Sequence, residues 1–149
     1  MILGRRDLQR WVQVLLYASP QQAMSQNPLL QTAVARARLM ETLAQQVEKA
    51  HGGQRDRAFM VGILSLLDVL LGVSMRDIVT ELSIEAEVKE ALISRGGLQG
   101  KLWSLIESKE ADDVVATQET MRSLPGITPA SLTAADFEAV SWTDQLVGS

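Results

Sequence analysis

The feature that most constrains this sequence is an apolar run from Ala58 to Val73, interrupted only by Ser65 and Asp68. A membrane-spanning helix needs about 20 apolar residues, so this run is too short to span and instead predicts a buried helix. Its apolar residues point in nearly every direction around a helix, which means that other helices must surround it. We therefore expect one central helix over residues 57–72. Gly62 is unfavourable inside a helix by about 1 kcal/mol relative to Ala, so we expect it to permit a close helix crossing.

The rest of the chain repeats its apolar residues with the period of a helix, and no stretch alternates for long as a strand would. Prolines, glycines and capping residues divide it into segments. We predict an all-α, single compact domain of about seven to eight helices. The expected helices cover residues 1–18, Asn27-Pro28 to about Ala50, 57–72, Ser74 to Leu82, Ser83 to Gly96, 98–106, 114–123, and Thr128-Pro129 to Leu146.

Composition excludes several functional classes. The chain has 149 residues, the size of one ordinary domain. It contains no Cys and one His, His51, so thiol nucleophiles, disulfides and multi-His metal sites cannot form. Its net charge of −4 argues against a nucleic-acid binder, which needs a basic face. The N-terminus lacks the apolar stretch of a signal peptide, so we expect a cytoplasmic protein without membrane insertion.

Four charged residues beside the apolar stripes are candidate interaction residues: Arg36, Arg38, Glu41 and Asp68. Arg38 and Glu41 are three residues apart and can form an ion pair on one helix face. For Arg36, Arg38 and Glu41 we favour pairing within the fold over a role in binding. Asp68 lies in the most apolar helix, where an unpaired carboxylate is unfavourable. It should reach an arginine or a helix N-terminus, or else face a binding groove.

No group of residues predicts catalysis. Ser65 could act as a nucleophile only with a base nearby, and no His is free for that role. Asp112 and Asp113 could bind a hard cation, but adjacent carboxylates on a helix point about 100° apart. They are more typical of a charged helix start, which the helix dipole favours. His51, between residues typical of a turn, is interpreted as a solvated side chain.

Several segments, in this order and spacing, resemble the HDOD domain (HD-related output domain) of bacterial EAL–HDOD signalling proteins. They are the opening Leu3 to Trp11, then Asn27-Pro28-Leu29-Leu30, Arg36 to Glu41, Phe59 to Asp68, and the stretch with Leu82, Val88, Ala91, Leu92, Arg95, Gly97 and Gly100. Residues 27–110 match best, and residues 111–149 form the C-terminal helices. The resemblance covers most of the chain, and it implies a helical relative of the metal-dependent HD phosphohydrolases.

In those hydrolases a buried helix carries Gly, two apolar residues and then a metal-binding His-Asp pair. Here Gly62-Ile63-Leu64 is followed by Ser65-Leu66, neither of which binds a divalent metal well. The resemblance therefore implies a non-catalytic output domain without a metal or cofactor. It would act by contact with an EAL domain of its parent protein, with another signalling protein or with a second copy of itself. Arg36, Arg38, Glu41 and Asp68 would contribute to those contacts.

The sequence departs from the family in two ways. It contains no EAL domain, the cyclic di-GMP phosphodiesterase fold, and its HDOD-like part is shorter at the N-terminus. We therefore expect it to be the later portion of a larger signalling protein. Two other functions stay open: an HD-type metal-dependent nucleotide phosphohydrolase, and a small-ligand sensor with a pocket between its long helices.

Overall fold

A computed structural model describes residues 28–47, 53–81 and 84–147 of the chain. The described residues form helices and no strand, which confirms the predicted all-α, single compact domain. No helix among them is long and apolar enough to cross a membrane. In chain order the helices are α2 (Pro28–Gln46), α3 (Gln54–Leu64), α4 (Leu67–Leu71), α5 (Met75–Glu81), α6 (Ala86–Ser94), α7 (Gly97–Glu110), α8 (Val114–Arg122) and α9 (Pro129–Val147).

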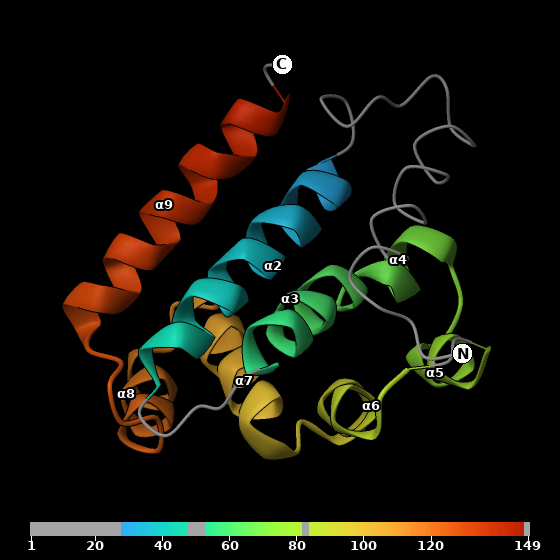
Figure 1. Ribbon diagram of the computed structural model, residues 1–149, viewed down its shortest axis with the longest axis horizontal. Coiled ribbons are helices and arrows are strands. Elements are labelled where there is room, and N and C mark those ends of the chain that lie inside the picture. The colour runs from blue at the N-terminus through green and yellow to red at the C-terminus, as the bar shows by residue number, and fades with distance from the viewer. Residues whose placement is uncertain (1–27, 48–52, 82–83, 148–149) are drawn as a thin grey trace.

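Helix α2 is the axis of the fold (Figure 1). It packs most extensively against α3 on one side and α9 on the other, and both neighbours run antiparallel to it. Helix α7 contacts α2, α3, α6 and α8, so it covers the part of the core that α2 and α3 leave open. Fully buried apolar side chains from these helices form one continuous core, among them Met40, Leu43, Leu64, Leu102 and Leu105.

The predicted close crossing at Gly62 is present between α2 and α3. A Cβ atom added to Gly62 would lie 2.6 Å from the backbone nitrogen of Ala37 and closer still to the Ala37 Cα atom. Backbone atoms cannot swing aside as the end of a flexible side chain can. Glycine is therefore needed at this position to let the two helices approach.

The single central helix predicted over residues 57–72 is wrong, because the segment forms two helices. Helix α3 begins earlier, at Gln54, and ends at Leu64, and α4 begins at Leu67. The break falls on Ser65-Leu66, where Leu66 has φ −115° and ψ 4°. The Ser65 hydroxyl donates to the Gly62 carbonyl oxygen at 2.7 Å and accepts from Arg36 Nη1 at 3.0 Å. A side chain that bonds to backbone and to a buried guanidinium competes with continuation of the helix.

Most predicted helix starts are confirmed. Helices α2 and α9 begin at Pro28 and Pro129. The Ser74 hydroxyl accepts from the backbone N–H of Asp77 at the start of α5. Asp113 caps α8 by accepting from the Ala116 backbone N–H at 3.1 Å, as its interpretation as a helix start predicted.

Some boundaries differ or lie outside the described residues. Helix α6 ends at Ser94, two residues before the predicted Gly96, because Arg95 itself takes the left-handed conformation at φ 59°. The predicted helix over residues 1–18, the end of the second helix beyond residue 47, His51 and the predicted cap Ser83 lie outside the described part of the chain.

Candidate functional site

Three of the four predicted interaction residues lie on α2, and two of them face opposite sides of that helix. Arg38 points toward one flank of α9, whereas Arg36 points toward α7 and the break between α3 and α4. Residues two apart on a helix are separated by about 200°, so this divergence follows from the helix geometry. The two arginines therefore belong to different ion-pair groups.

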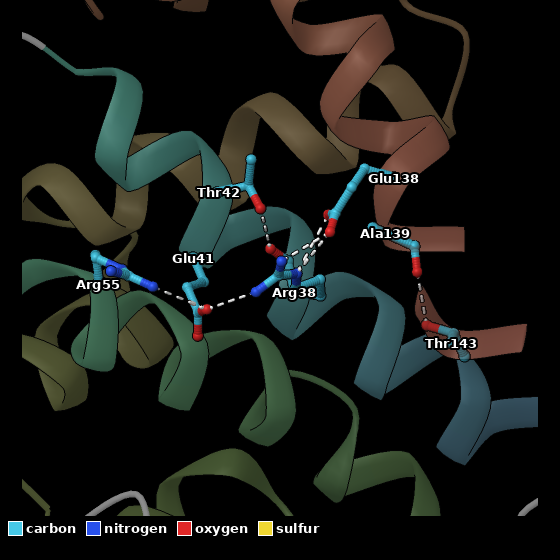
Figure 2. Close-up of polar contacts among 7 residues, drawn as sticks. All are labelled: Arg38, Glu41, Thr42, Arg55, Glu138, Ala139 and Thr143. Carbon is cyan, nitrogen blue, oxygen red and sulfur yellow. Dashed lines mark hydrogen bonds and ion pairs between the residues drawn. The ribbon is translucent and has the colours of Figure 1, made fainter. Parts of the chain in front are cut away.

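Arg38 lies at the centre of the first group (Figure 2). Its Nη2 atom is 2.7 Å from Glu138 Oε1 on α9, and its Nη1 atom is 2.9 Å from Glu41 Oε1 on α2. Arg55, at the start of α3, lies 3.4 Å from the same Glu41 oxygen. The Arg38 guanidinium also lies over the Trp142 ring, 5.5 Å from its centroid. This group joins α2, α3 and α9.

Burial distinguishes Glu41 from the other members of this group. Its side chain is 1% exposed, whereas that of Glu138 is 43% exposed. The predicted pairing of Arg38 with Glu41 is confirmed, and Glu41 is more deeply buried than its place at the edge of the stripe indicated. The hydrogen bond that Arg38 donates to the Glu138 carboxylate, with the charges of Glu138 and Glu41, raises the pKa of Arg38 above its ordinary value despite partial desolvation. Arg38 is thus held in its charged form.

Arg36 forms the second group with Ser65 and Glu110. Its Nε and Nη2 atoms donate to the two Glu110 carboxylate oxygens at 3.1 and 2.7 Å. Its Nη1 atom donates to Ser65 Oγ at 3.0 Å. The Arg36 side chain is 10% exposed. A single guanidinium therefore ties α2 to the α3–α4 break and to the last residue of α7.

Asp68 lies apart from both groups, in the first turn of α4. Its Oδ1 atom accepts from the backbone N–H of Val69 at 2.9 Å. The break at Ser65-Leu66 creates this helix N-terminus, where a carboxylate is electrostatically favoured. Of the alternatives left open by the sequence, Asp68 therefore reaches a helix N-terminus.

A cleft of about 430 Å³ opens between α2, α7 and α9 beside Arg36. Lys109 of α7 forms an ion pair with Asp136 of α9 at its edge, next to the pair of Arg36 with Glu110. Sequence reasoning missed Lys109, Glu110, Asp136 and Glu138 as partners. They lie 27 to 100 residues from the residues they bind, so no local spacing could identify them.

The chemistry that these groups offer is ion pairing and hydrogen bonding. Within residues 28–47, 53–81 and 84–147, no three His, Asp or Glu side chains gather in a way that could hold a metal ion. In both groups an arginine connects helices that are distant in sequence. The arrangement fixes the relative positions of α2, α3, α7 and α9.

The chain is similar to part of two bacterial proteins. It is 34% identical over 112 residues to the cyclic di-GMP phosphodiesterase CdgJ of Vibrio cholerae, which covers 74% of this chain and 25% of CdgJ. It is 29% identical over 109 residues to the uncharacterized protein YuxH of Bacillus subtilis, which covers 72% of this chain and 25% of YuxH. The chain thus spans about a quarter of the length of each relative. No protein-family model and no solved structure matches it.

Proposed function

We propose that this chain is a non-catalytic regulatory domain of the HDOD type that functions in cyclic di-GMP signalling. The similarity to CdgJ, a cyclic di-GMP phosphodiesterase, supports the signalling context. The motifs shared with the HDOD domain support the domain type. The domain would act in the cytoplasm, through contacts with an EAL-type domain or with another signalling protein.

The observation that carries the non-catalytic assignment is the contact between Arg36 and Ser65. By the HDOD resemblance, Ser65 occupies the position of the metal-binding His in catalytic HD domains. A guanidinium, buried to nine-tenths, donates to the Ser65 hydroxyl at 3.0 Å. A fixed positive charge at this distance repels a divalent cation in the same place, more strongly where water is excluded. The position of the Arg36 guanidinium therefore supports a structural role for this part of the fold, in place of the metal centre of a catalytic HD domain.

Arg38 and Glu41 fit the same proposal as positioning residues. Their side chains are engaged within the fold, so they would act on a partner indirectly, by fixing α2 and α9. The surface of those two helices would then make the contact. A direct role of Arg36, Arg38, Glu41 or Asp68 in binding stays a prediction.

A hydrolysis assay separates this proposal from the HD-type phosphohydrolase alternative. The purified chain is incubated with cyclic di-GMP, and separately with a nucleoside triphosphate, in the presence of Mg²⁺, Mn²⁺ or Fe²⁺. We expect no product above the protein-free blank. Hydrolysis that grows with chain concentration and stops on adding a chelator would show that the domain is an enzyme.

A further inference from the structure

Three depressions along α9 join into one groove. The first, about 250 Å³, lies between the start of α2 and the later part of α9, and shares Thr32 and Ala35 with the central cleft. The cleft in turn shares Lys109 and Asp112 with a third depression of about 260 Å³ between α7, α8 and α9. The shared residues make these hollows consecutive parts of a single surface feature, which we call the α9 groove.

Large apolar side chains are exposed along this groove. Val140 and Val114 line it and are 50% and 65% exposed. Phe137 is 76% exposed and lies one turn before Val140 on α9. A single exposed apolar residue is ordinary on a protein surface. Several beside a hollowed, mostly apolar groove indicate a surface that binds a partner.

The charges of the groove favour a basic partner. Its two cations, Arg36 and Lys109, are already paired with Glu110 and Asp136. Asp112 and Asp144 remain as exposed carboxylates, the first where the central cleft meets the third depression and the second in the first depression. The lining therefore has an excess of negative charge distributed along its length.

We propose that the α9 groove binds an amphipathic helix of a partner protein, with apolar side chains in the groove and lysine or arginine residues facing Asp112 and Asp144. An elongated groove that combines exposed apolar side chains with carboxylates along its length suits recognition of a helix through side chains spaced three and four residues apart. This inference rests on the proposed function, because it specifies the contact through which a non-catalytic domain would act. The opposite charges would set the orientation and speed the association of the helix.

The test uses a fluorescein-labelled 18-residue helical peptide with leucines on one face and lysines on the other, measured by fluorescence anisotropy against the purified chain. A matched peptide carries glutamate in place of every lysine. We expect the lysine peptide to bind and the glutamate peptide to bind far more weakly. Val140→Ser should weaken binding of the lysine peptide about tenfold, and Asp112→Asn with Asp144→Asn about fivefold.

Matched changes on α4 and α5 serve as controls, since Figure 1 shows these helices on the opposite side of the molecule from α9. Val69→Ser removes another exposed valine, and Asp77→Asn with Glu81→Asn removes two exposed carboxylates. Equal losses in the control and groove variants, or equal binding of both peptides, would contradict the proposal.

Self-association would contradict it in another way. If the chain is dimeric by light scattering and Val140→Ser makes it monomeric, the groove is an interface between copies of the chain. The hydrolysis assay is independent of peptide binding. Failure of the groove proposal and failure of the proposed function can therefore be distinguished.

Discussion

At the scale of single residues, the fold depends on charges placed where water cannot reach them. Glu41 is 1% exposed, and its Oε1 atom lies near both Arg38 and Arg55. A buried carboxylate is tolerated only when cations and hydrogen bonds replace its hydration. The interactions of α2 with α3 and α9 therefore include an electrostatic contribution in addition to apolar packing.

Arg38→Ala should reduce the free energy of unfolding by about 3 kcal/mol, the lower end for removing one partner of a buried pair, because Arg55 remains beside Glu41. Urea unfolding followed by circular dichroism measures the change.

The pH dependence of this effect follows from the pKa of Arg38, which is raised in the folded state. The contribution of Arg38 to the free energy of unfolding is therefore fully present below the pKa of the unfolded chain, and it is lost only as pH rises above that pKa toward the folded one. The loss in free energy of unfolding caused by Arg38→Ala should therefore stay constant as pH rises from about 7 to 9, because Arg38 stays charged in both states over that range.

Arg57→Ala is the matched control. The carboxylates of its partners, Glu85 and Glu87, are 37% and 56% exposed, so water replaces the lost interaction. This change should lower the free energy of unfolding by less than about 1 kcal/mol. If the two substitutions had equal effects, burial of Glu41 would not be the source of the stability.

The sequence predicts the pair of Arg38 with Glu41 because both residues lie on one helix at a favourable spacing. It does not predict Glu138 or Glu110, because these contacts form only when α9 and α7 pack against α2. Ser65 is an intermediate case. Its polarity inside an apolar run is visible in the sequence, but its hydrogen bond with Arg36 forms only when α2 packs against the α3–α4 break.

At the scale of elements, the close crossing of α2 and α3 at Gly62 is a contact that the sequence predicted. Gly62→Ala should destabilise the chain by about 3 kcal/mol, since the new Cβ atom would collide with the Ala37 backbone. The cost of this collision outweighs the roughly 1 kcal/mol by which alanine is more favourable than glycine in a helix interior. Thermal unfolding monitored by circular dichroism would show the loss as a lower midpoint.

Gly96→Ala is the control for that prediction. A Cβ atom there would meet the Glu90 side chain, whose flexible end can move away. Gly96 also has φ −78°, which alanine adopts without strain. We expect a change within about 0.5 kcal/mol. A severe loss at Gly96, or none at Gly62, would contradict the assignment of Gly62 to a backbone-to-backbone contact.

At the scale of the whole molecule, the all-α fold class followed from the helical period of the apolar residues. Most helix starts also followed from the sequence, because prolines and capping residues act locally, as at Pro28, Ser74, Asp113 and Pro129. The α9 groove did not, because it forms only when α2 packs against α7, α8 and α9, which lie far from α2 in the sequence. The same holds for the ion pairs that fix those walls. Local signals thus define the elements, and packing defines the surface they present.

We propose that Arg36, which connects α2 with the α3–α4 break and α7, takes the place of a metal ion there. The most direct measurement is the molar ratio of metal to purified chain, determined by mass spectrometry after equilibration with Zn²⁺, Fe²⁺ or Mn²⁺ and removal of excess ion. We predict far less than one equivalent of each metal. One equivalent retained per chain, and lost on substitution of side chains around Ser65, would contradict the account.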